Sequence, residues 1–155
     1  MCMYTDQYRA KKALKDIICY KIVCAGGQKM EGFKARYYTF RYEIGKTYME
    51  QAWRNIANAK SDLATYKWCV MIGFHSYTGY WTAYDNTYPG LILLKCVIPK
   101  GSFYFEGVDS TGEKCYCSNS IKPIAYQTLC DRKWYITPWV EYKKKPGKNP
   151  GKNPK

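Results

Sequence analysis

Two residue types that support catalysis or metal binding are scarce in this sequence. Of 155 residues, one is a histidine, His75, and 12 are Asp or Glu. A single histidine excludes a metal site built on two histidines. The acidic residues are scattered along the chain, which argues against a hydrolytic carboxylate pair or a magnesium site.

Several familiar motifs are also missing. The chain has neither Gly-x-Gly-x-x-Gly after a strand nor Gly-x-x-x-x-Gly-Lys-Ser/Thr, so we expect no nucleotide cofactor. No stretch approaches the roughly 20 apolar residues of a membrane span, and the first six residues lack a basic segment followed by an apolar run. We therefore expect an intracellular protein without a membrane span.

Cysteine, in contrast, is plentiful. The eight cysteines are at positions 2, 19, 24, 69, 96, 115, 117 and 130. Because no export signal is evident, we expect them to stay reduced and to act as small core hydrophobes. A mixed zinc site from His75, Cys69, Cys115 and Cys117 is the alternative, but Cys-x-x-Cys spacing is absent, so no metal is predicted.

The charge of the chain is strongly positive. Lys and Arg number 25 against 12 Asp and Glu, which gives a formal net charge of +13. Such a field favours nucleic acid, anionic lipid or an acidic protein surface as partner. The alternative is that the excess charge only keeps a chain with 17 Tyr and 5 Trp soluble.

Length and composition predict one globular basic domain over 1–142. The tail 143–155 repeats Pro-Gly-Lys-Asn, contains six lysines and lacks apolar residues, so it is predicted to be disordered in isolation. For the domain we predict an α+β fold, in which a twisted, mostly antiparallel and aromatic-rich sheet is accompanied by two or three helices.

Hydrophobic periodicity predicts helices over 6–18 and 50–66, with a short helical or irregular stretch over 77–84. Strands are predicted at 19–25, 33–44, 68–72, 91–98, 103–106, 114–118 and 134–142. A turn is expected at 43–48, and the hairpin between the fifth and sixth strands turns at Asp109-Ser110-Thr111-Gly112.

The predicted strand 33–44 mixes aromatic and basic residues. Its alternation places aromatics beside basic groups on one face, an arrangement that can stack bases over a cationic groove. The candidate binding residues are therefore Lys34, Arg36, Tyr38 and Arg41, together with Lys143, Lys144 and Lys145 of the tail. The alternative is a half-buried strand with a basic outer face, which the aromatic character of every predicted strand favours.

Four segments of the chain, spread over about 20–125, resemble small domains encoded by phages, gut bacteria and large DNA viruses. They are Gly45-Lys46-Thr47-Tyr48, Gly73-Phe74-His75, the strand 91–98 ending in Pro99-Lys100-Gly101, and Ser118-Asn119. The resemblance implies a viral or mobile-element context and supplies no activity.

A second resemblance is to the layout of ADP-ribosyltransferases. It implies an enzyme whose site residues would be His75, Ser76, Tyr84 and Glu113. Those enzymes hold their dinucleotide with an Arg or His on the first strand, where this chain has Tyr20 and Lys21.

From these observations we predict a non-enzymatic accessory protein of a phage or virus, either a virion component or an inhibitor of a host factor. It would bind nucleic acid or an acidic protein through a basic aromatic surface and its tail. The alternative is a mono-ADP-ribosyltransferase-like enzyme.

Overall fold

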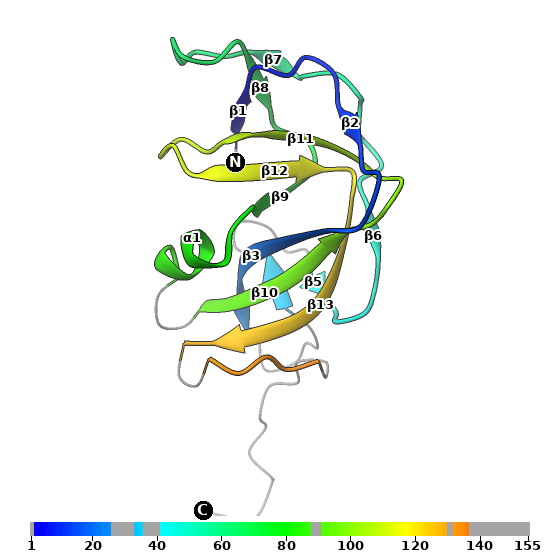
Figure 1. Cartoon of the computed structure of the whole chain (residues 1–155), viewed down its shortest axis with the longest axis vertical. Helices are drawn as coiled ribbons and strands as arrows, with labels where there is room; N and C mark the ends of the chain where they lie inside the picture. The colour runs from blue at the N-terminus through cyan, green and yellow to red at the C-terminus, as the bar shows by residue number, and fades with distance from the viewer. Residues whose placement is uncertain (1, 26–32, 36–40, 88–90, 130–131, 137–155) are drawn as a thin grey trace, which may run out of the picture.

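The computed structural model describes residues 2–25, 33–35, 41–87, 91–129 and 132–136. Within these ranges the chain forms one strongly curved antiparallel sheet and one short helix (Figure 1). The elements are β1 Met3–Thr5, β2 Lys11–Lys12, β3 Ile17–Ala25, β4 Phe33–Ala35, β5 Arg41–Tyr42, β6 Tyr48–Met49, β7 Ala59–Lys60, β8 Trp68–Val70, β9 Phe74–Tyr77, α1 Tyr80–Asp85, β10 Leu91–Ile98, β11 Phe103–Val108, β12 Lys114–Ser118 and β13 Ser120–Thr128.

The strands follow the spatial order β6-β13-β10-β3-β9-β12-β11-β1-β8-β7. Outside this path β2 pairs with β11, while β4 lies between β3 and β5. Figure 1 shows β3, β10 and β13 in one half of the molecule and β1, β8, β11 and β12 in the other, with β9 between them. Strands distant in sequence therefore become neighbours throughout the sheet.

The longest pairing is between β3 and β10. Eight residue pairs join them without a break, from Leu91 opposite Cys24 to Ile98 opposite Ile17. Both strands are rich in Ile, Val and Leu, which suit a pleated surface that is covered on both faces. Strand β13 continues this ladder on the other side of β10.

Each face of this ladder contributes to a different hydrophobic cluster. On one face Cys19, Val23, Leu94 and Cys96 pack with Phe74 and other residues. On the opposite face Ile22, Leu91 and Leu93 pack against Ala83 of α1. A third cluster, formed by Met3, Val70, Phe105, Cys115 and Cys117, fills the half of the sheet around β1 and β12.

The predicted α+β class is wrong. The described residues form a mostly antiparallel sheet with a single helix of six residues, where we expected two or three helices. The sheet itself is aromatic-rich and antiparallel, as predicted.

The predicted helix over 6–18 is wrong, since this stretch consists of bends, β2 and the start of β3. Backbone donors of this segment bond to distant partners: Ala10 N donates to Asn55 O at 2.9 Å and Ala13 N to Ser102 O at 2.7 Å. Leu14, which a helix would have buried, is 83% exposed. Hydrogen bonds to distant segments thus outweigh the helical periodicity of 6–18, because no part of the described fold covers the apolar face that a helix here would present.

The predicted helix over 50–66 is also wrong, since this stretch consists of turns and β7. Its polar side chains bond to the backbone instead. Asn58 Oδ1 accepts hydrogen bonds from Met71 N and Ile72 N, and Ser61 Oγ accepts one from Leu63 N at 2.9 Å. Such bonds compete with helix formation, and Trp53 still reaches the third cluster without a helix.

Five predicted strands are confirmed, at β3, β8, β10, β11 and β12, and the short helical stretch corresponds to α1. The hairpin turn is also confirmed: Gly112 has φ +88° and donates its N–H to Asp109 O at 3.1 Å. Asp109 Oδ1 accepts bonds from the Thr111 and Glu113 backbone amides. In 33–44 the structure shows β4 and β5, residues 43 and 44 are not in a strand, and 36–40 lie outside the described residues. In 134–142 only Tyr135 pairs, with Tyr126, and 137–142 lie outside the described residues.

Strand β13 was not predicted. Pro123 lies inside it, and proline within a run argues against an interior strand. The structure accommodates Pro123 at an irregularity, because the register between β10 and β13 shifts between Lys95 and Cys96. The Pro123 carbonyl accepts a hydrogen bond from Gly45 N at 2.8 Å.

The expectation that every thiol stays unpaired is wrong for Cys2 and Cys69, which form a disulfide. Antiparallel pairing of β1 with β8, with Tyr4 opposite Cys69, brings the two cysteines together. The sequence alone gave no sign of this pairing because 67 residues separate them. The other described cysteines, at positions 19, 24, 96, 115 and 117, are free thiols.

We expect the Cys69→Ser variant to be less stable than the oxidised protein by roughly 4 kcal/mol, the chain-entropy value for a loop of this length. Urea unfolding with and without reductant measures the difference, which should vanish once both proteins are reduced. Cys24→Ser, which removes a free thiol, is the matched control. If peptide mapping of the unreduced protein finds no Cys2–Cys69 cross-link, the pairing is disproved.

Candidate functional site

The helix α1 lies beside the β3–β10 ladder (Figure 1), and three of its six residues are aromatic: Tyr80, Trp81 and Tyr84. It begins after Gly79, whose backbone is extended, and its C-terminal carbonyls are capped by polar side chains. Asn86 Nδ2 donates to Thr82 O at 2.8 Å and Thr87 Oγ1 to Ala83 O at 2.7 Å. Ala83 is fully buried and Tyr80 and Tyr84 pack against the same cluster, so the helix is fixed on the sheet while the ring of Trp81 is exposed.

The segment 132–136 returns alongside β13. Tyr126 and Tyr135 exchange backbone hydrogen bonds of 2.8 Å in both directions, and their rings stack. The buried Gln127 connects this segment to α1, because its Oε1 accepts from Tyr80 Oη at 2.7 Å and its Nε2 donates to Arg132 O at 2.7 Å. One carboxamide thus positions both parts of the site.

Together these elements gather five rings, which we call the aromatic platform: Tyr20, Tyr80, Trp81, Tyr84 and Trp134. Tyr80 is at the centre, with ring centroids 5.8 Å from Tyr20, 4.9 Å from Trp81, 5.9 Å from Tyr84 and 5.9 Å from Trp134. Most of these pairs are tilted or edge-on, the geometry that aromatic quadrupoles prefer.

Two cations border the aromatic platform. Lys95 Nζ lies 5.6 Å from the centroid of Trp134, and the Arg132 guanidinium carbon lies 5.0 Å from that of Tyr84. Both are cation–π distances. The register of β10 on β3 determines the position of Lys95, which is opposite Tyr20 on the neighbouring strand.

The outer part of the aromatic platform is accessible. Trp81 is 61% exposed and Trp134 is 36% exposed, although the rings beneath them pack on the hydrophobic cluster around Ala83. Burial raises the pKa of the Tyr20 hydroxyl above its ordinary value, and the neighbouring Cys19 and Tyr80 add to this effect. The platform therefore has a dry base and a solvent-facing edge.

The two sequence-predicted binding residues that the structure describes, Lys34 and Arg41, are not among the platform residues. Lys34 is opposite Arg41 in the β4–β5 pairing, and Nε and Nη1 of Arg41 are buried without a hydrogen-bond partner. Arg36, Tyr38, Lys143, Lys144 and Lys145 lie outside the described residues. The platform was missed because Tyr20, Lys95, Arg132 and Trp134 come together only through strand register. Tyr80 and Tyr84, four residues apart in a predicted short helix, were the available signal.

The four residues of the alternative enzyme hypothesis come from three places. His75 and Ser76 are neighbours on β9, so their side chains point to opposite faces of the sheet. Tyr84 is on α1 and Glu113 is at the β11–β12 hairpin. Among the described residues no hydrogen bond joins any two of these four side chains, and the enzyme reading stays a hypothesis.

His75 is held in a largely buried environment. Its Nε2 is 3.3 Å from Val70 O, and its Nδ1 is 4.0 Å from the sulfur of Cys117. Burial, followed by the charge of the nearby Lys21 ammonium, lowers the pKa of His75 from 6.5 to about 4. The imidazole is therefore neutral near pH 7.

Lys21 is the cation closest to this histidine. Its ammonium donates a hydrogen bond to the His75 carbonyl and lies 5.6 Å from the ring centroid of Tyr42. Burial lowers the pKa of Lys21, while the neighbouring thiols of Cys96 and Cys19 act in the opposite direction. The same burial raises the pKa of Cys19 to about 11, so its thiol is protonated near pH 7.

The described residues offer no metal centre, because no three His, Cys, Asp or Glu side chains converge among them. Of the zinc ligands considered above, Cys117 is near His75, whereas the sulfur of Cys69 is bonded to Cys2. Within the same ranges no helix has the length and apolar character needed to cross a bilayer.

Comparisons with known proteins add no relative: neither the family models nor the curated proteins nor the solved structures contain a match. The interpretation of the site therefore depends on its own geometry and chemistry.

The depressed pKa of His75 predicts a pH dependence of stability. The unfolded chain takes up a proton near pH 6.5, whereas the folded protein does so only near pH 4. The contribution of the neutral His75 to the free energy of unfolding is thus complete above pH 6.5 and is lost as the pH falls toward 4. It totals roughly 3 kcal/mol.

Urea unfolding between pH 4 and 7.5 tests this expectation against the variant His75→Gln, which has no imidazole to titrate. Carboxylates titrate in both proteins, so the difference between the two pH profiles isolates His75, the only histidine of the chain. Parallel profiles would mean that His75 is protonated as easily in the folded as in the unfolded protein.

Proposed function

We propose that this protein is a non-enzymatic binding protein for single-stranded nucleic acid and that the aromatic platform is its binding surface. The observation that carries the proposal is the presence of two solvent-exposed tryptophans, Trp81 and Trp134, on a platform that two cations border, with Lys95 over Trp134 and Arg132 over Tyr84. In this proposal the protein acts as an accessory protein of a phage or virus, the context that the sequence resemblance implies.

The exposed rings support a binding role because packing alone does not require them. Ala83, Ile22, Leu91 and Leu93 already close the cluster beneath α1. Trp81 adds a large apolar surface that remains 61% exposed, and a base stacked on it would remove that surface from water. Stacking is tolerant of sequence because every base has an aromatic face.

The cations support an anionic partner. Lys95 and Arg132 form no ion pair among the described residues, and both are positioned beside rings on which bases would stack. The formal charge of +13 adds long-range attraction for a polyanion. An acidic protein would use the same charges but would not need the exposed indoles to stack on bases.

Fluorescence anisotropy with a labelled 12-nucleotide dT strand tests the proposal. Trp81→Ala should weaken binding about 5- to 150-fold, the range for loss of one base–aromatic stack. The matched control is Tyr8→Ala, because Tyr8 also combines an exposed ring with a cation, Arg9, and a ring neighbour, Trp68, outside the platform. It should leave affinity within about twofold, a margin too small to count as a lost stack.

A strand of the same length without bases and a polyglutamate chain complete the experiment. The proposal requires both to bind weakly and without dependence on Trp81. If polyglutamate competes as well as dT, or if Trp81→Ala and Tyr8→Ala behave alike, the partner is an acidic protein surface or the platform is not the site.

Salt dependence gives a separate expectation for the cationic groups. On a single strand each phosphate contact adds roughly 0.7 to the slope of log affinity against log salt. Replacing Lys143, Lys144 and Lys145 with Ala should therefore flatten the slope by up to about two units, and Lys95→Met by about 0.7. A slope that none of these changes alters would show that other groups contact the backbone.

A further inference from the structure

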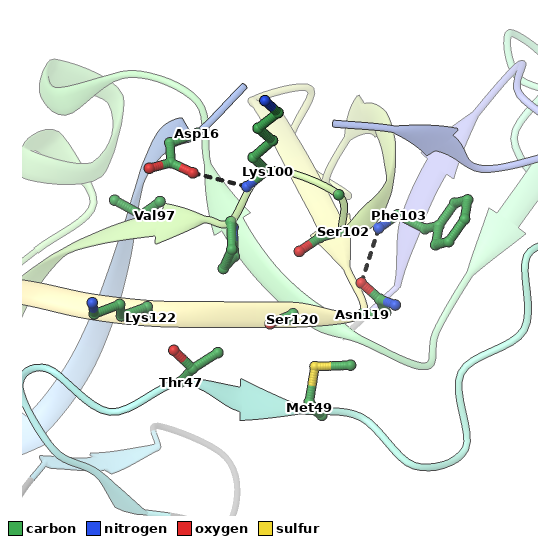
Figure 2. A pocket seen from close by; sticks show the side chains of 12 residues that line it. Asp16, Thr47, Met49, Val97, Lys100, Ser102, Phe103, Asn119, Ser120 and Lys122 are labelled. Atoms are coloured by element: carbon green, nitrogen blue, oxygen red, sulfur yellow. Dashed lines mark hydrogen bonds between the residues drawn. The ribbon is translucent and has the colours of Figure 1, made fainter. Parts of the chain in front are cut away.

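A second candidate site lies at the carboxyl end of β10. Here a pocket of about 460 Å³ opens between the turn after β10, the turn between β12 and β13, and strand β6 (Figure 2). This volume is in the range of pockets that hold small organic molecules, and it exceeds what a bare ion fills. The aromatic platform contributes no residue to it.

The walls of the pocket come from segments far apart in sequence. Thr47 and Met49 belong to the stretch around β6, Lys100 and Ser102 to the turn after β10, and Ser120 to the start of β13. Three of the segments that carry the viral resemblance therefore meet here. The pocket is a product of the tertiary fold and of no local motif.

Hydrogen bonds fix the two turns rigidly. Asn119 Oδ1 accepts from Phe103 N at 2.9 Å and Asn119 N donates to Phe103 O at 3.0 Å. On the other side Asp16 Oδ1 accepts from Lys100 N at 2.8 Å, and Gly101 N donates to Ala13 O at 2.8 Å. The site is thus formed before a ligand arrives, which lowers the entropy cost of binding.

The polar lining favours an anion that also carries hydroxyl groups. Lys100 and Lys122 supply ammonium groups, and neither forms an ion pair among the described residues. Figure 2 shows the Ser102 hydroxyl directed toward the middle of the pocket, with Thr47 on the facing wall. Asp16 adds a carboxylate, which accepts hydrogen bonds from hydroxyls but repels phosphate.

We infer that this pocket binds a sugar phosphate, with the phosphate near Lys122 and Lys100 and the sugar hydroxyls near Asp16 and the Ser and Thr side chains. Ammonium groups hold phosphate through charge-assisted hydrogen bonds, while hydroxyls and a carboxylate suit a polyhydroxylated carbon skeleton. The ligand is either a free sugar phosphate or the phosphorylated end of a nucleic acid. The inference does not depend on the function proposed for the aromatic platform.

Calorimetric titration with ribose 5-phosphate at 150 mM salt, using ribose and inorganic phosphate for comparison, tests the inference. Ribose 5-phosphate should bind at least tenfold more tightly than either, because only it engages both parts of the pocket. The variant Lys122→Met keeps the apolar stem and should lose at least about tenfold in affinity. Lys60→Met removes an exposed lysine of β7, outside the pocket, and should change nothing.

A substitution of Asp16 should change affinity in the opposite direction to Lys122→Met. Asp16→Asn removes a negative charge while it retains an oxygen for Lys100 N, so it should tighten the binding of inorganic phosphate several-fold. Asp62→Asn, a change at an exposed carboxylate that does not line the pocket, is the matched control. Melting temperatures of all variants verify that they fold.

The outcomes distinguish the two possible sources of the ligand and show which results would overturn the inference. Tighter binding of a 5′-phosphorylated oligo-U strand, whose first ribose keeps a free 2′-hydroxyl, than of its 5′-hydroxyl form, lost in Lys122→Met, would identify a nucleic-acid end. Binding of ribose 5-phosphate without that gain would identify a free sugar phosphate. Undetectable binding of ribose 5-phosphate, or equal effects of the Lys122 and Lys60 variants, would overturn the inference whatever the result for the aromatic platform.

Discussion

The unbroken pairing of β3 with β10 is the constraint on which the other features of this structure depend. Its eight pairs place Cys19 and Val23 in one hydrophobic cluster and Ile22 in another. The same register places Tyr20 opposite Lys95, which brings a ring and a cation of the aromatic platform together. Its far end, where Ile98 precedes the turn, forms one wall of the pocket. A slip of one residue would move all of these side chains to the wrong face.

The strands that could be predicted are those whose own residues determine them. β10 is continuously apolar, and β11 and β12 flank a turn whose Asp109 and Gly112 satisfy its backbone locally. The two helices failed for a different reason. Helical spacing in 6–18 and 50–66 is real, but backbone donors such as Ala10 N, Ala13 N and Ala57 N bond to carbonyls of segments distant in sequence. Single-sequence periodicity contains no information about such partners.

The place of the candidate site could not be predicted from the sequence. Charge and aromatic content predicted a basic aromatic binding surface, for which we propose the aromatic platform bordered by Lys95 and Arg132. Its members come from β3, α1, β10 and the segment 132–136, so only the tertiary fold assembles them. Strand β13 illustrates the same limit, since Pro123 argues against a strand unless the register shift beside it is known. The buried Lys21 and His75 were likewise invisible, because burial is a property of the fold.

Gln127 has a consequence for the positively charged end of the chain. By bonding to both Tyr80 and the Arg132 carbonyl, it anchors residues 132–136 beside α1. Seven residues on from Ile136 the sequence reaches Lys143, so chain length alone keeps this lysine within roughly 25 Å of that anchor. Chain length therefore tethers Lys143 to the aromatic platform, and for a ligand stacked there as proposed its effective concentration would be on the order of millimolar. A weak electrostatic contact between this lysine and the bound ligand would thus form within one complex and would not need a second encounter.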